Sequence, residues 1–137
     1  MWWAYALCSA LFAALTAVFA KIGIKNVDTN LAVAVRTTVI LFLAWAIAYF
    51  RGGTATLGVL TKYNLAFLTL SGITTGLSWI FYFKALELGK VSQVAPVDKL
   101  SLALTIIFSV IFLGETLSIK TAIGAALILA GTVVIIL

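Results

Sequence analysis

Five uninterrupted apolar runs account for most of the chain. Each run is about 20 residues long, which is the length that lets an α-helix cross the hydrocarbon core of a bilayer. The strands of a membrane barrel would instead need about 10 residues in strict alternation. The sequence therefore predicts an all-α integral membrane protein, a bundle of five transmembrane helices. The predicted spans are Trp3–Ile22, Leu31–Phe50, Asn64–Leu88, Val91–Leu113 and Ile119–Leu137.

Composition supports the bilayer as the solvent of this chain. Of its 137 residues 64% are hydrophobic and 9% are charged, whereas soluble domains carry about 25% charged residues. The net charge of +5 comes from side chains scattered at span ends, as is usual in membrane proteins, so no nucleic-acid partner is predicted. With Cys8 as the one cysteine and no histidine, we expect no internal disulfide, metal site or haem cofactor.

The start of the first span bears on whether the span is cleaved off as a signal peptide. No basic residue precedes Trp2, and a secretory signal requires a charged leader and a shorter apolar core. The first span is therefore predicted to be retained. Because the number of spans is odd, the two termini are expected on opposite sides of the membrane.

Three charged residues lie inside the predicted spans rather than at their ends. Arg36 is in the second span, and Asp98 and Lys99 are about 10 Å into the fourth. An ionised group at that depth is costly unless it is paired or hydrated. We expect a polar vestibule that opens toward the face holding the loops after the first and third spans. Alternatively, Asp98 pairs with Arg36 or Lys99 as an inert bridge while Lys99 reaches the headgroups.

Pro96, the only proline, also falls in the fourth span. If the helix starts near Val91, the proline lies beyond the first turn and leaves a carbonyl without its helical partner. Irregular backbone of this kind is tolerated beside a water-filled cavity. Alternatively, residues 91–95 form a loop and Pro96 is the first helical residue, where proline is favoured.

An aromatic cluster lies near the end of the third span. Trp79 and Tyr82 are one helical turn apart and share a face, which would line the vestibule or belong to an interfacial aromatic belt. Lys84 and Glu87 share a face in the same way and would neutralise each other. Asp28 or Asn30 is expected to cap the second span.

Small residues mark helix faces suited to close packing. Gly72 and Gly76 form a Gly-x-x-x-Gly pair in the third span, and Gly124 and Gly131 lie on a smooth stripe in the fifth. These faces would pack either within one chain or between two. Glu115 follows the fourth span and is interpreted as a structural loop residue that caps the next helix or binds a loop amide; the alternative is a proton-carrying role.

Four motifs in the second half of the chain are Tyr82-x-x-Ala85-Leu86, Val94-Ala95-Pro96, Leu113-Gly114-Glu115 and the closing Gly124…Leu127-Ile128-Leu129-Ala130-Gly131-Thr132. Together they resemble the EamA domain of the drug/metabolite transporter superfamily. The resemblance extends over nearly the whole chain, because Trp3, Lys21 and Arg36 fit the weaker pattern of its front half. The run from Ala95 to Ser101 is most similar to the short bacterial and archaeal branch. The resemblance implies one EamA-like domain over residues 1–137, in a cytoplasmic membrane, that exports or exchanges a small-molecule substrate.

The same resemblance bears on assembly, because EamA proteins usually carry two such domains as an inverted repeat. One copy is half of that repeat, which implies an antiparallel homodimer working by alternating access, with a site between protomers. Small multidrug resistance proteins are distant relatives with an acidic residue in the first span; Trp3–Ile22 has none, so that route of proton exchange is not expected.

The placement of Lys and Arg allows two orientations. One face has six of them and the other three, which favours the first face inside the cell. Without Arg36, Lys84 and Lys99, which are set within helices, the loops have three each and favour neither direction, which leaves dual topology open. The first set is Lys21, Lys25, Arg36, Lys84, Lys90 and Lys99, and the second is Arg51, Lys62 and Lys120.

The leading hypothesis is therefore a transporter protomer whose pathway residues are Arg36, Trp79, Tyr82, Pro96, Asp98 and Lys99. A second hypothesis is a non-transporting membrane scaffold or partner subunit of a larger complex. An enzyme is not expected, because no nucleophile–base pair, metal set or phosphate loop is found in the sequence.

Overall fold

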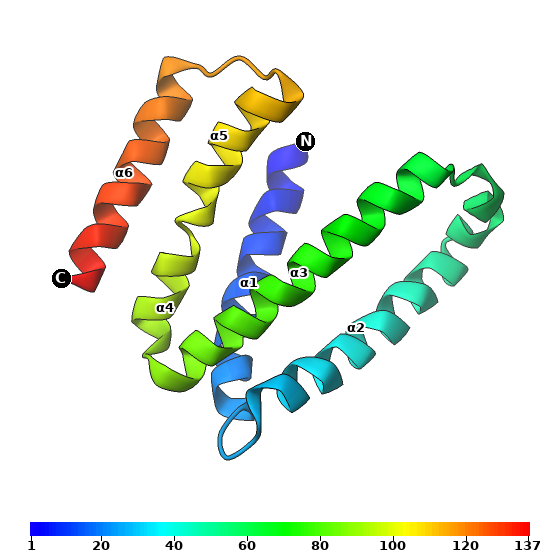
Figure 1. The fold of residues 1–137 in the computed structure, drawn as a ribbon, viewed down its shortest axis with the longest axis horizontal. Coiled ribbons are helices and arrows are strands. Elements are labelled where there is room, and N and C mark those ends of the chain that lie inside the picture. The colour runs from blue at the N-terminus through cyan, green and yellow to red at the C-terminus, as the bar shows by residue number, and fades with distance from the viewer. The chain divides into compact units, whose positions relative to one another are not determined.

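The computed structural model describes residues 1–137 and contains helices and loops without any strand (Figure 1). Five helical segments are long and apolar enough to cross a membrane, which confirms the predicted fold class. The helices are α1 (Trp2–Gly23), α2 (Thr29–Phe50), the 3₁₀ helix η1 (Gly53–Val59), α3 (Lys62–Leu88), α4 (Val91–Asp98), α5 (Ser101–Leu113) and α6 (Ile119–Ile136). Together α4 and α5 make the fourth spanning segment, Val91–Leu113.

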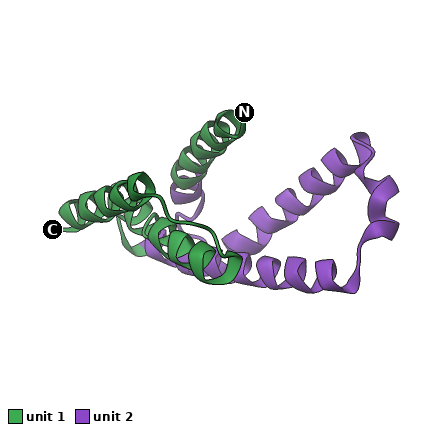
Figure 2. Cartoon of the chain, turned by 90° about the horizontal axis from the view of Figure 1, so that it is seen from above, with its two compact units in different colours: residues 1–18, 88–137 green, residues 19–87 purple.

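The chain divides into two compact units (Figure 2). Unit 1 consists of residues 1–18 and 88–137, and unit 2 consists of residues 19–87. The interpretation of all 137 residues as one domain stays a prediction.

Unit 2 is built on the helix pair α2 and α3. Helix α2 begins at Thr29, two residues before the predicted start, because Asp28 caps it: the carboxylate accepts a hydrogen bond from the Leu31 N–H at 3.0 Å. This contact confirms Asp28 as the predicted cap. Helices α2 and α3 run antiparallel and converge where α2 begins and α3 ends (Figures 1 and 2).

The other end of this pair is joined through η1. Gly52 has φ +74°, a left-handed conformation that favours glycine over residues with a Cβ. It follows the last turn of α2 and leads the chain into η1. The connection is therefore a short helix rather than an extended loop.

Unit 1 contains a broken helix beside a continuous one. Helix α4 ends at Asp98 and α5 begins at Ser101, while α6 runs antiparallel beside both (Figure 1). The buried Thr132 hydroxyl of α6 donates to the Ile128 carbonyl at 2.9 Å and lies 3.4 Å from the Pro96 carbonyl of α4. This contact holds α6 against the segment that carries the break.

Candidate functional site

A stacked arginine forms the centre of the candidate site in unit 2. The guanidinium carbon of Arg36 lies 4.2 Å from the centroid of the Trp79 ring and 5.3 Å from that of Phe83. Both distances are within the range of cation–π attraction. Phe83 is buried, whereas Arg36 and Trp79 are half-buried. The cation is thus held against α3 while part of it stays accessible.

Tyr82 belongs to the same cluster. It is half-buried, lies within electrostatic range of the Arg36 guanidinium, and its ring meets that of Phe83 edge-on at 6.4 Å. The structure therefore brings together three of the residues singled out from the sequence, Arg36, Trp79 and Tyr82. Phe83 is a fourth member that the sequence reading did not select, although its place one turn from Trp79 was a usable signal.

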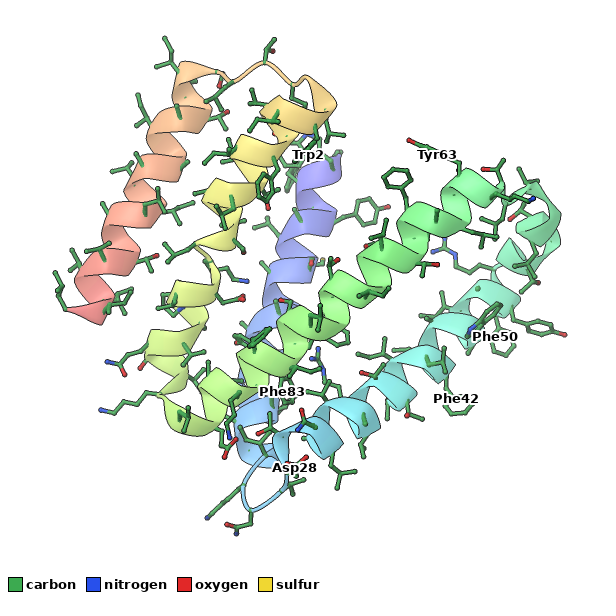
Figure 3. All side chains as sticks on the ribbon, in the orientation of Figure 1. Trp2, Asp28, Phe42, Phe50, Tyr63 and Phe83 are labelled. Carbon is green, nitrogen blue, oxygen red and sulfur yellow. The ribbon has the colours of Figure 1, made fainter.

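The cluster lies well inside the span rather than at its end. Arg36 follows the start of α2 by about two helical turns, or roughly 10 Å. On α3, Trp79 lies a similar distance before Glu87, which is near the end of the helix. Phe83 lies about half that distance before Glu87. Because the guanidinium lies closer to Trp79 than to Phe83, Arg36 does not turn back toward the near end of the helices. Figure 3 shows Phe83 on α3 above the start of α2 at Asp28.

Polar side chains form a network at one end of unit 2, where α1 ends, α2 begins and α3 ends. Lys84 and Glu87 form an ion pair at 2.8 Å, which confirms the predicted neutralisation. The Thr29 hydroxyl also donates to Glu87, and the Lys21 ammonium donates to the Leu86 carbonyl. These contacts from α1 and α2 were not predicted, because they join residues far apart in the sequence.

Pro96 lies inside α4, which begins at Val91, so the alternative in which residues 91–95 form a loop is wrong. Lacking an N–H, Pro96 cannot bond the carbonyl one turn earlier. The chain then tightens: the Lys99 N–H donates to the Pro96 carbonyl, and the Leu100 N–H to that of Val97, each at 3.0 Å. These shorter-range bonds mark 3₁₀ geometry. The fourth spanning segment is thereby interrupted next to its charged residues.

Those charged residues pair with each other. The Lys99 ammonium lies 3.5 Å from the Asp98 carboxylate, and the two side chains are 52% and 37% exposed. A pair this open to its surroundings contributes little to stability. Asp98 and Arg36 lie in different units, and the pathway role of Pro96, Asp98 and Lys99 stays a prediction.

The glycines of the two smooth faces are not needed for packing inside their own units. A Cβ added at any of them would meet no heavy atom of its unit within 4 Å. These residues are Gly72, Gly76, Gly124 and Gly131.

Glu115 lies in the loop between α5 and α6. The cap of α6 is Ser118, whose hydroxyl accepts from the Thr121 N–H at 3.1 Å, so the capping role expected for Glu115 is wrong. The backbone N–H of Glu115 donates to the Ser109 carbonyl at 3.3 Å, and Gly114, with φ +66°, makes the turn. Backbone geometry thus shapes the turn at Gly114, and the Ser118 side chain shapes the start of α6.

Comparison with known proteins decides the family. Residues 1–137 match the EamA-like transporter family. The chain belongs to that family. It is also similar to a Sinorhizobium protein named an uncharacterized transporter in the cobO 3′ region, with 45% identity over 134 residues, 98% of this chain and 95% of the relative. An uncharacterized protein of Methanocaldococcus jannaschii is 28% identical over 100 residues, 66% of this chain and 73% of the relative.

No solved structure matches the chain. The family and the Sinorhizobium relative confirm the resemblance to EamA proteins stated from the sequence motifs. With its five spanning segments, this EamA-like protein is a multi-pass membrane transporter.

Proposed function

We propose that the protein moves small metabolites or related organic solutes by alternating access, as an antiparallel homodimer. The observation that carries this proposal is the stacking of Arg36 on Trp79 about two turns inside a spanning helix pair. Charged side chains at such depth mark solute and ion pathways, because they are otherwise costly to retain. A scaffold that docks through its outer surface would have no use for this cation.

Each unit has its own proposed pathway residues. Unit 2 supplies the Arg36 cluster with Trp79 and Tyr82. Unit 1 supplies Pro96, Asp98 and Lys99 at the break between α4 and α5. Interrupted helices supply the binding sites of many transporters built from inverted repeats, since the break exposes backbone polar groups to the solute.

The open glycine faces support the proposed dimer. Gly72 and Gly76 on α3, like Gly124 and Gly131 on α6, have no close neighbour within their units. Such faces allow another helix to approach closely. We assign them to contacts with a second protomer or to helix sliding during the transport cycle.

The contribution of Asp98 is tested by flux. Wild type, Asp98→Asn and the control Glu115→Gln are reconstituted in vesicles, and uptake of a panel of labelled neutral, cationic and anionic solutes is measured. We expect Asp98→Asn to lower the flux of every active solute by about tenfold, because it removes the carboxylate that pairs with the Lys99 ammonium beside the helix break, and Glu115→Gln to leave it unchanged. Equal flux in all three proteins would remove Asp98 from the pathway and leave an inert bridge.

Antiparallel pairing is tested by the accessibility of one terminus in intact cells. Leu137→Cys is introduced in a Cys8→Ser background, which removes the only native cysteine, and a membrane-impermeant maleimide is added before and after permeabilisation. An antiparallel dimer places the C-termini on both sides, so both steps label the protein equally. Labelling confined to one step would show a single orientation and contradict the antiparallel homodimer.

A further inference from the structure

The Arg36 guanidinium has no acidic partner within unit 2. The two carboxylates of this unit are Asp28 and Glu87. Asp28 caps α2 through the Leu31 N–H, and Glu87 pairs with Lys84 and accepts from Thr29. Both are engaged at the helix ends, about two turns away from Arg36. Within unit 2 the guanidinium therefore stacks on aromatic rings and pairs with no carboxylate.

The surroundings of Arg36 leave its hydrogen-bonding edge open. Stacking on Trp79 and Phe83 covers the face of the guanidinium, whereas its five N–H donors point outward in the plane of the group. Arg36 forms no side-chain hydrogen bond or ion pair in the structure, yet no buried side-chain nitrogen lacks a partner. Its donors are therefore accessible, and the fork they form matches a carboxylate or phosphate.

The depth of the group favours a dissolved anion over a lipid headgroup. A headgroup would attract the long arginine side chain back toward the end of the helices. Instead the guanidinium stays beside Trp79, the ring farther from that end, at 4.2 Å. The half-buried rings of Trp79 and Tyr82 next to it offer a flat apolar surface.

From this geometry we propose that Arg36 binds the carboxylate or phosphate group of an organic anion, and that Trp79 and Tyr82 contact its apolar part. The assignment rests on the proposed transport function and narrows its substrate class to organic anions. Arg36 is the residue that discriminates an anion from a neutral solute of the same shape.

The binding test uses Trp79 as the reporter. Trp2, Trp3 and Trp45 are replaced by Phe, so that Trp79 is the only tryptophan left. Its fluorescence is recorded in phosphatidylcholine vesicles during titration with benzoate, and with benzamide as the neutral analogue of the same size. We expect saturable quenching by benzoate and little response to benzamide.

Variants of Arg36 and Arg51 show which arginine binds benzoate. Arg36→Gln removes the charge and is expected to weaken benzoate binding on the order of 10- to 100-fold, while Arg36→Lys, which lacks the fork, gives an intermediate loss. Arg51→Gln is the matched control, since Arg51 follows the last residue of α2, and it should bind benzoate as the parent does. Equal binding of benzoate and benzamide, or equal losses in Arg36→Gln and Arg51→Gln, would overturn the proposal.

Two further arms separate the remaining explanations. Vesicles with 30% phosphatidylglycerol test whether Arg36 binds a lipid headgroup. An Arg36-dependent change in Trp79 fluorescence without benzoate would show headgroup binding and overturn the proposal of a dissolved organic anion. Uptake of neutral and cationic solutes by the wild type tests the proposed function separately. Flux of these solutes without benzoate binding would refute the organic-anion substrate class but not transport. Benzoate binding without flux of any solute would refute transport but not the anion-binding site.

Discussion

In unit 2, Arg36 of α2 stacks on Trp79 of α3, and Glu87 of α3 accepts a hydrogen bond from Thr29 of α2. In unit 1, Asp98 pairs with Lys99, the next residue along the chain. The first two contacts join different helices, so they change whenever those helices move apart. A pair of adjacent residues is insensitive to such movement, so the charged groups of unit 2 respond to helix motion and those of unit 1 do not.

The buried side chains follow the same division. Ile24, Val33, Phe83 and Leu86 are buried in unit 2, and all of them lie near the end where α2 begins and α3 ends. The buried residues of unit 1 are Ala17 and Thr132. One end of unit 2 is thus a packed anchor, and it holds the Arg36 cluster at a defined depth.

The largest effect is expected from removing the most buried side chain of this anchor. Leu86 is fully buried, whereas Leu88 on the same helix is 78% exposed. Leu86→Ala leaves a cavity and should lower the free energy of unfolding by about 2–5 kcal/mol. Unfolding is followed by titration with dodecyl sulfate in mixed micelles. Leu88→Ala is the control, and an equal loss in both variants would contradict the assignment of the anchor.

An intermediate effect is expected from the polar network. Glu87→Gln removes the ion pair with Lys84 and weakens the hydrogen bond from Thr29, so the thermal midpoint in detergent should fall, by less than in Leu86→Ala. Glu115→Gln changes a loop carboxylate with no ion pair and should leave the midpoint unchanged. The comparison between the units would be wrong if Glu115→Gln proved as destabilising as Glu87→Gln.

The smallest effect is expected in unit 1. Thr132→Val removes the contact of the hydroxyl with the Pro96 carbonyl, and polar contacts between membrane helices average about 0.6 kcal/mol. Thr105 donates only within its own helix, to the Ser101 carbonyl at 2.8 Å, so Thr105→Val is the matched control. Thr132→Val should be the more destabilising of the two in the same dodecyl sulfate titration. If Thr132→Val lowered the free energy of unfolding as much as Leu86→Ala, the packing of unit 1 would be as important for stability as that of unit 2, and the comparison would be wrong.

The features that could be predicted from the sequence depend on neighbours along the chain. The lengths of the apolar runs predict the spanning helices, the position of Asp28 predicts the cap, and the spacing of Lys84 and Glu87 predicts their ion pair. Each was confirmed because each is decided within about one turn of one helix or by run length alone.

The features that escaped prediction join distant parts of the chain. The hydrogen bonds from Thr29 to Glu87 and from Lys21 to the Leu86 carbonyl depend on which helix ends converge, and periodicity carries no such information. The contact of Arg36 with Phe83 also joins two helices, and its only signal in the sequence was the one-turn spacing of Phe83 from Trp79. The capping role expected for Glu115 was wrong because Ser118, directly before α6, already supplies the oxygen.

The most direct test of the account is solute flux through proteoliposomes of wild type, Arg36→Gln and Arg51→Gln. Both substitutions remove one arginine from α2 or its end, and only Arg36 stacks on Trp79. We predict that wild type and Arg51→Gln carry the same solute above protein-free vesicles, and that Arg36→Gln carries it about tenfold more slowly. Equal flux in all three proteins, or none above protein-free vesicles, would contradict the account.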